Sequence, residues 1–186
     1  EKIVIAYLGD SITQGIGAEK FENGFAPVSF QKIKKFVGNK ANIEYINVSA
    51  GGTTSIFGNT MVTKEILSKK ADIIFIEYVA LDKTEQNYRI SMESLIRTCL
   101  NNENKPAVVL IIPCMDRVPL RQEFMTQLGK YYNLPVISIA NAVHPEISSG
   151  RMNPEEYFVD FVHPTEYGHR LMSDFIMNYI KKYPMF

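Results

Sequence analysis

The stretch KIVIAYLGDSITQGIG, residues 2–17, contains a buried strand and the turn that follows it. Residues 3–8 are apolar or aromatic without polar alternation, which is typical of a strand covered on both faces. Gly9 permits a tight exit because it has no Cβ, and Asp10 is a residue that hydrogen-bonds to turn backbone. Ser11 is therefore expected just past the carboxyl end of the strand, where open α/β folds bind ligands. It is a candidate nucleophile, although turn chemistry alone would also explain a serine here.

Four later segments, short and mainly apolar, predict the remaining strands. They cover residues 43–48, 73–76, 108–112 and 136–139. Segments with helical periodicity separate them, including one that ends at Val37 before Gly38 and a long one over residues 88–100. Strands that alternate with helices of about 11 to 20 residues indicate helices on both faces of a parallel sheet. The sequence therefore predicts an α/β protein, a three-layer α/β/α sandwich with a five-stranded parallel sheet.

The end of the chain contains one irregular region and one clear helix. Residues 141–158 include Pro145, Gly150 and Pro154, and we interpret them as an irregular surface excursion. The last helix is expected to begin after His163, with His163 as the N-cap and Pro164 at the first helical position. No linker or internal repeat interrupts the pattern, so residues 1–186 are predicted to form a single domain.

The charge balance argues against proteins that bind polyanions. Acidic and basic residues number 20 each, so no broad positive field favours nucleic acid or an anionic membrane. No apolar run approaches the roughly 20 residues that span a bilayer. No set of His, Cys, Asp or Glu has metal-ligand spacing, and Gly9, Gly15 and Gly17 do not match a phosphate-binding loop. The sequence thus predicts no metal, no cofactor, no nucleic-acid partner and no membrane span.

The cysteines and the first residue bear on the cellular compartment. Cys99 and Cys114 form no CxxC pair and lie in apolar segments, so buried free thiols are expected. The chain opens at Glu1 rather than Met, which predicts that an upstream segment was removed. Nothing here indicates an oxidised secreted scaffold. The compartment stays open, with the cytoplasm favoured, and so does the oligomeric state.

Three loops follow the first three predicted strands. The loops cover residues 9–11, 51–53 and 79–82, and a fourth segment, residues 160–163, precedes the last helix. Because the carboxyl ends of parallel strands meet at one edge of a sheet, the three loops should open there together.

These segments contain the groups that nucleophilic catalysis by serine requires. The hydroxyl needs an imidazole to take its proton, a carboxylate to orient the imidazole, and N–H donors for the oxyanion. Asp160 lies three residues before His163, so its carboxylate can reach the far ring nitrogen. His163 could instead be only a helix cap, and Gly51-Gly52 only a turn. The order Ser…Asp…His occurs without a GxSxG elbow, which argues against an α/β-hydrolase.

The chain resembles the GDSL, or SGNH, family of esterases and acylhydrolases over essentially its whole length. The opening GDSITQG is similar to that family's first block, residues 47–55 resemble the second, and Asp160-x-x-His163-Pro164 resembles the last. The resemblance implies a flavodoxin-like fold, with Ser11 as nucleophile, His163 as general base and Asp160 as its orienting partner. It also implies an oxyanion hole lined by the backbone N–H groups of Ser11 and Gly52.

The third block departs from the family pattern. The family usually has Gly-x-Asn-Asp there, with the Asn side chain as a third oxyanion donor. The aligned residues here are 79–82; Asp82 fits, but Leu81 stands at the Asn position and cannot donate a hydrogen bond. Losing one such donor typically costs about 100- to 1000-fold in turnover. Asn59 and Thr53 are candidates for a substitute donor.

Three functions follow from these observations. The first is hydrolysis of small carboxylic esters, such as O-acetylated carbohydrate, through an acyl-Ser11 intermediate, with a small-molecule ester as the partner. The second is carbohydrate O-acyl transfer, in which an alcohol replaces water as the second nucleophile. The third is a member that has lost catalysis and binds a glycan or a protein, and Leu81 is the feature that favours it.

Overall fold

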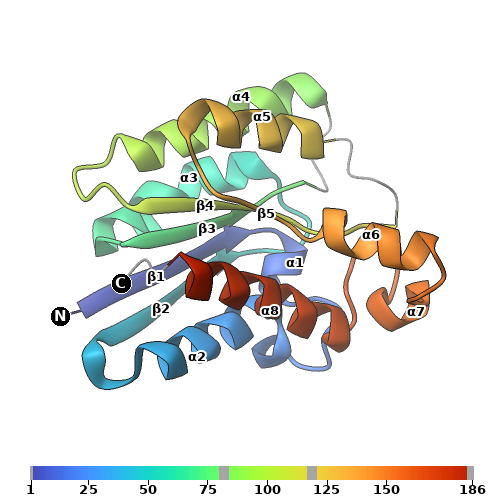
Figure 1. Cartoon of the computed structure of the whole chain (residues 1–186). Coiled ribbons are helices and arrows are strands. Elements are labelled where there is room, and N and C mark those ends of the chain that lie inside the picture. Colours follow the sequence, from blue (N-terminus) through green and yellow to red (C-terminus); the bar gives the residue numbers. More distant parts are fainter. Residues whose placement is uncertain (1, 80–83, 117–120, 184–186) are drawn as a thin grey trace.

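The structure is a computed structural model in which residues 2–79, 84–116 and 121–183 are described. A five-stranded sheet with the order β2-β1-β3-β4-β5 forms its centre, and all neighbouring strands are parallel (Figure 1). The strands are β1 (Lys2–Gly9), β2 (Asn42–Ser49), β3 (Ile73–Glu77), β4 (Ala107–Ile112) and β5 (Val136–Ser138). The predicted α/β class is confirmed.

Each central strand contributes to two hydrophobic cores, because successive side chains point to opposite faces of a sheet. Leu8 of β1 and Ile76 of β3 lie in the core on one face. Tyr7 and Phe75, the residues just before them, lie in the core on the other face, with their rings stacked at 5.0 Å. Burial on both faces is why these strands read as continuous apolar runs.

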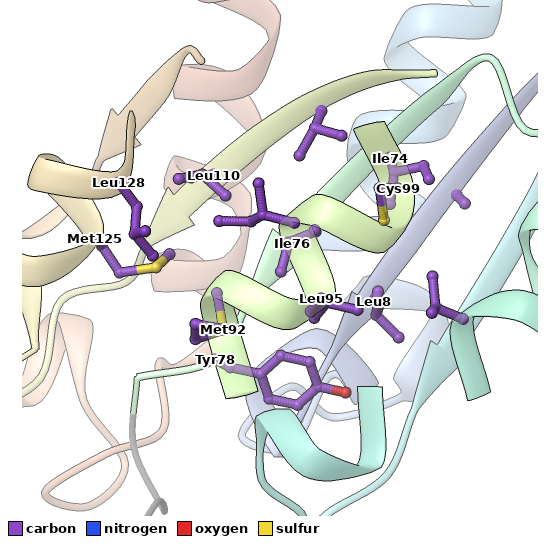
Figure 2. Close-up of a cluster of buried hydrophobic side chains, with 14 of the residues drawn as sticks. Leu8, Ile74, Ile76, Tyr78, Met92, Leu95, Cys99, Leu110, Met125 and Leu128 are labelled. Atoms are coloured by element: carbon purple, nitrogen blue, oxygen red, sulfur yellow. The ribbon is translucent and has the colours of Figure 1, made fainter. Parts of the chain in front are cut away.

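Helices cover both faces of the sheet (Figure 1). On one side lie α3 (Ser55–Glu65), α4 (Glu85–Leu100) and α5 (Gln122–Tyr132), whose side chains enter the first core (Figure 2). On the other side lie α2 (Phe25–Val37) and α8 (Glu166–Lys182), which pack together and are joined by an ion pair of 2.8 Å between Lys32 and Asp174. Short 3-10 turns lie at Phe21–Asn23, Gly38–Lys40 and Leu67–Lys69. The predicted three-layer arrangement is therefore present.

The prediction of an irregular excursion over residues 141–158 is wrong. Two helices, α6 (Ala140–Ser148) and α7 (Pro154–Tyr157), occupy most of it. Pro145 lies inside α6, although proline costs about 3 kcal/mol in a helix interior. Val143 and Tyr157 are buried in the second core. Packing of these apolar side chains outweighs the local signals of proline and glycine.

The last helix begins later than predicted, and His163 is not its N-cap. The helix α8 starts at Glu166 with Thr165 as the cap, and the Thr165 hydroxyl accepts a hydrogen bond of 3.1 Å from the N–H of Gly168. The residues before it form a tight loop that is closed by a bridge between Phe158 and Pro164. A threonine hydroxyl is a good cap acceptor, and its use leaves the imidazole of His163 for another contact.

The strand order places the end of β1 at the switch point of the sheet. The chain passes from β1 to β2 on one side and then to β3 on the other, and open α/β folds bind ligands at such a point. The helix α1 (Ser11–Gln14) starts there directly. A Cβ at Gly9 would lie 2.0 Å from Thr13 Oγ1, so only glycine lets α1 fold back so closely over the strand end.

Cys99 and Cys114 are buried free thiols, as the sequence predicts. Burial raises the pKa of each thiol to about 12. Among the described residues, no helix combines the length and the apolar character needed to cross a bilayer.

Candidate active site

Ser11 is the first residue of α1, and Asp10 holds the turn in front of it. The carboxylate oxygen Oδ1 of Asp10 accepts a hydrogen bond of 3.1 Å from the N–H of Ile12. Ser11 is only 5% exposed. The serine is thus held by a capped backbone turn at the carboxyl edge of the sheet.

Asp160 shapes the loop that contains His163. Its Oδ1 accepts hydrogen bonds of 2.8 Å from the backbone N–H groups of Val162 and His163. Its Oδ2 lies 2.7 Å from Nδ1 of the His163 ring. Burial raises the pKa of Asp160, but these three hydrogen bonds and the charge of His163 outweigh burial and hold the pKa below its ordinary value. Asp160 is therefore an ionised acceptor for the imidazole at neutral pH.

The two segments meet through His163 and Ser11. The ring nitrogen Nε2 of His163 lies 2.9 Å from Ser11 Oγ. Gly17 makes this approach possible, since it has a positive φ of 103° and a Cβ there would lie 2.1 Å from the carbonyl oxygen of Pro164. The structure thus brings Ser11, His163 and Asp160 into one chain of hydrogen bonds, with the His163 and Asp160 side chains 20% and 49% exposed.

The loop after β2 lies beside the nucleophile. Gln14 of α1 accepts a hydrogen bond of 2.7 Å from the N–H of Gly51 through its side-chain oxygen. A Cβ at Gly51 would lie 3.8 Å from the Cβ of Ser11. Asn47 adds a second link, because its side-chain amide donates a hydrogen bond of 3.2 Å to the carbonyl oxygen of Thr13. Gly52, the predicted oxyanion residue, follows Gly51 directly.

The sequence matches the GDSL-like lipase/acylhydrolase family over residues 7–171. The chain belongs to this family. The matched region includes both the segment around Ser11 and the segment around His163, and it confirms the resemblance seen in the sequence. Together with the esterases among the solved structures, it supports the prediction of a serine hydrolase that acts on esters. Among curated proteins, no significant match was found.

Solved structures extend the comparison. A two-domain esterase active on acetylated mannans, co-crystallised with mannopentaose, is 32% identical, with a TM-score of 0.90 over 97% of this chain and 49% of that chain. The chain therefore spans about half the length of that esterase. An acetyl xylan esterase is 17% identical, with a TM-score of 0.77 over 96% of this chain and 100% of its own. A lipase/acylhydrolase from Enterococcus faecalis is 24% identical, with a TM-score of 0.72 over 97% and 96%. The last two share the fold.

The family's third block falls mostly beyond the described part of the chain. Residues 80–83, which include Leu81 and Asp82, lie outside the described residues. The two candidate substitutes can be placed. Thr53 donates its hydroxyl to the carbonyl of Ala50 at 2.6 Å, and Asn59 donates its amide to the carbonyls of Ser55 and Ser91 at 3.1 and 2.7 Å. Both are committed to backbone acceptors, which argues against either as a substitute for the family's Asn.

His169 has a structural place in α8, near but not in the hydrogen-bond chain of the site. Its ring is fully buried; Nδ1 accepts from the N–H of Phe25 at 3.2 Å, and Nε2 donates to the carbonyl of Ile16 at 3.0 Å. Burial lowers its pKa, and the charge of His163 lowers it further, against the opposing effects of the Ile16 carbonyl and Glu166. His169 thus ties α8 to Ile16 and to the start of α2.

Sequence reasoning missed two polar features of this edge. One is the tether from Gln14 to Gly51, and the other is a pair of buried carboxyl groups, Asp10 and Glu77. Glu77 stands at the end of an apolar run, where it reads simply as the exit from a strand. Within residues 2–79, 84–116 and 121–183, His, Cys, Asp and Glu side chains form no group of three that could bind a metal ion.

Proposed function

We propose that the protein hydrolyses carboxylic esters through a covalent acyl-Ser11 intermediate. The observation that carries this proposal is the continuous chain from Ser11 Oγ through both ring nitrogens of His163 to Asp160, with distances of 2.9 and 2.7 Å. Both distances lie within the reach that proton transfer and orientation require. Membership of the GDSL-like family supports the same class of reaction.

Acylation begins when Ser11 Oγ attacks the ester carbonyl carbon while its proton passes to Nε2 of His163. The Nδ1–H group of His163 donates to ionised Asp160, which fixes the tautomer and stabilises the imidazolium that forms. The tetrahedral intermediate then collapses, and His163 returns the proton to the leaving alcohol oxygen. The C–O bond of the ester is broken, and the acyl group remains on Ser11.

Deacylation repeats these steps with water. His163 takes a proton from water as its oxygen attacks the acyl-Ser11 carbonyl. Collapse of the second tetrahedral intermediate expels Ser11 Oγ, which recovers its proton from His163. The products are a carboxylic acid and the free enzyme.

In this proposal the backbone N–H groups of Ser11 and Gly52 hold the oxyanion. Ser11 is the first residue of α1, so its N–H has no acceptor within the helix. The tether from Gln14 to Gly51 supports the second donor by fixing the residue before Gly52. Without the family's side-chain donor, we expect turnover to be lower by about 100- to 1000-fold than with all three donors.

The proposed substrate class is carbohydrate with small O-acyl groups, acetyl in particular. The support is the two-domain esterase active on acetylated mannans, which is 32% identical over 97% of this chain. Phe161 lies between Asp160 and His163 in the loop and is 78% exposed. An exposed apolar ring beside a site is a surface on which a ligand can pack, and the face of a sugar ring would suit it.

The proposal is tested by comparing the wild type with Ser11→Ala on p-nitrophenyl acetate, p-nitrophenyl butyrate and acetylated mannan. We expect kcat to fall by roughly a million-fold in the variant, with an unchanged melting temperature. The wild type should hydrolyse p-nitrophenyl acetate faster than p-nitrophenyl butyrate. A phosphonate that reacts with serine should label the wild type alone. Equal background rates in both proteins, without labelling, would instead favour a binding role. An acylated sugar product in place of free acid would indicate acyl transfer.

A further inference from the structure

Two carboxyl groups that the ester mechanism does not use lie beneath the nucleophile. Asp10 and Glu77 are each 1% exposed. Glu77 is the last residue of β3 and pairs in register with Gly9 of β1, so its side chain stands next to the turn that holds Ser11. Burying two unpaired negative charges side by side is costly, and the arrangement therefore needs a physical explanation.

The hydrogen bonds of the two carboxyl groups leave one oxygen of each for the other. Asp10 Oδ1 accepts from the N–H of Ile12 at 3.1 Å, and Glu77 Oε2 accepts from the hydroxyl of Thr13 at 2.8 Å. The remaining oxygens, Asp10 Oδ2 and Glu77 Oε1, are buried and have no hydrogen-bond partner among the described residues. Each carboxyl group influences the pKa of the other, so the two groups are close neighbours. Two ionised carboxylates have no donor, so a hydrogen bond between these oxygens requires one of the groups to keep a proton.

The surroundings of Asp10 and Glu77 decide which of the two carboxyl groups keeps the proton. Burial raises the pKa of Glu77 well above its ordinary value, and the negative charge of Asp10 raises it further, against hydrogen bonds from Thr13 and from the backbone of Asp10. Burial also raises the pKa of Asp10, but only to about 6, because the N–H of Ile12 and the charge of His163, with smaller contributions from Glu77 and Ser11, favour its ionised form. These opposed surroundings favour the proton on Glu77, with Asp10 as the acceptor.

We propose that Glu77 is a positioning residue for the nucleophile, because its protonated carboxyl donates to Asp10 and so fixes the turn that begins at Ser11. One side of Asp10 is then held by Glu77 and the other by Ile12, which leaves a single negative charge in this buried pair. That charge interacts with His163 and Ser11, while Asp10 and Thr13 are the neighbours of the Glu77 carboxyl group within the described part of the chain. Asp10 thus adds to the stabilisation of the imidazolium, an effect that rests on the function proposed above.

Two substitutions of Glu77 separate the effect of a hydrogen-bond donor to Asp10 from the effect of the carboxyl group itself. In Glu77→Gln, the amide N–H donates to Asp10 and the amide oxygen accepts from Thr13, so kcat should stay close to that of the wild type. In Glu77→Ala, no donor remains; kcat should fall by about 10- to 100-fold, as a small misplacement of reacting groups does. KM should be unchanged in both variants, because Glu77 lies beneath Ser11 and not on the substrate side.

Two further readouts do not depend on ester turnover. The infrared C=O stretch of a protonated carboxyl group should be present at pH 7 in the wild type and in Ser11→Ala, and absent in Glu77→Gln. The unfolded chain gives up the Glu77 proton near pH 4.5, whereas the folded protein keeps it to a higher pH. Folding stability from this group is therefore lost as the pH rises, and Glu77→Gln should become more stable than the wild type as the pH is raised.

The matched control is Glu93→Gln on α4, where the Glu93 carboxylate accepts from the hydroxyl of Tyr132 at 2.7 Å. It should change neither kcat nor the infrared band. An identical infrared spectrum for wild type and Glu77→Gln at pH 7 overturns the proposal, and so does a Glu77→Gln variant as slow as Glu77→Ala. If Glu77→Ala does not fold, the infrared and stability comparisons decide the question. If Ser11→Ala retains activity, the proposed ester hydrolysis through Ser11 is wrong. The infrared C=O band still tests the protonated Glu77 in that case.

Discussion

The loop before α8 and the first turns of α8 each contain a histidine, and the two histidines have opposite surroundings. His163 in the loop is partly exposed and lies between a hydroxyl and a carboxylate. His169 in the helix is fully buried and lies between a backbone N–H and a backbone carbonyl. Both residues are histidines, but only the hydrogen-bond partners of His163 can accept a hydrogen bond from each nitrogen of a protonated imidazole ring.

This difference explains why only one of the two imidazoles can serve as a base. When His163 takes a proton on Nε2, it still faces an oxygen of Ser11 and a carboxylate of Asp160, both of which accept hydrogen bonds. When His169 takes a proton on Nδ1, that N–H points at the N–H of Phe25, and a hydrogen bond becomes a repulsion in a buried site. The partners, rather than the imidazole itself, therefore separate the proposed catalytic role from the structural one.

The largest effect that tests this comparison is expected for His163→Ala. Without the imidazole, Ser11 has no base, and kcat should fall by roughly a million-fold, as it does when the histidine of a serine protease is removed. The melting temperature should change little, because the side chain is partly exposed. Steady-state kinetics and thermal unfolding measure both quantities. Turnover well above that of Ser11→Ala would contradict the role of His163.

Asp160→Asn should give the next largest effect. The amide keeps the shape of the carboxylate but no longer favours the tautomer with Nδ1–H, which costs about 10⁴-fold in serine proteases. Because Asp160 is 49% exposed, water can partly replace it, and a loss of roughly 10³- to 10⁴-fold in kcat is expected. Asp174→Asn on the surface of α8 serves as the control and should keep the wild-type kcat. Full activity in Asp160→Asn would show that another group orients His163.

His169→Ala should act on stability more than on chemistry. It leaves the carbonyl of Ile16 and the N–H of Phe25 without their buried partner, which should cost roughly 3 kcal/mol of the free energy of unfolding. Urea denaturation at pH 8 measures this loss. A change below about 0.5 kcal/mol would show that water or a neighbouring group satisfies both backbone groups.

The same variant tests the pH dependence that burial of His169 implies. Burial lowers the pKa of His169 below its unfolded value of 6.5, so below that pH the unfolded chain binds a proton that the folded protein resists. The wild type should keep this stability above pH 6.5 and lose it as the pH falls. His169→Ala lacks this group, and its unfolding free energy should fall less between pH 7 and pH 5. Parallel curves for the two proteins would contradict the neutral, buried state of His169.

The smallest effect is expected at the loop after β2, which contains Gly52 of the proposed oxyanion hole. Gln14→Ala removes the tether to Gly51, a single exposed hydrogen bond of 2.7 Å. A contribution of about 1 kcal/mol corresponds to a loss of roughly fivefold in kcat, with little change in stability. Gln127→Ala on the outer face of α5 is the matched control, since its amide donates to the side chain of exposed Glu123 at 3.2 Å. Equal kcat values in the two variants would exclude a supporting role for Gln14.

Much of the fold and of the candidate site could be predicted because the relevant signals are local. Each buried parallel strand is apolar on both faces, so runs such as residues 3–8 and 108–112 are visible without alternation. The turn at Gly9 and Asp10 follows from single-residue chemistry. The family blocks around Ser11 and His163 predicted a site, and the structure brings these two residues together.

Other features had misleading local signals. Pro145 and Gly150 predict an irregular segment, yet burial of Val143 and Tyr157 stabilises α6 and α7. His163 followed by Pro164 reads as a helix start, yet the hydroxyl of Thr165 caps α8 instead. In the first case, packing against the second core outweighs the local pattern. In the second case, another local cap, two residues after His163, takes the place of the predicted one.

The sequence by itself determined the class of fold and the residue types at the site, since hydrophobic periodicity and short motifs are written in neighbouring residues. Only the tertiary structure decided that Glu77 lies beside the turn at Asp10, that Asn59 is committed to Ser55 and Ser91, and that burial lowers the pKa of His169. Hydrogen bonding and desolvation depend on which groups from distant parts of the chain become neighbours. Those neighbours exist only after the strands and helices have packed.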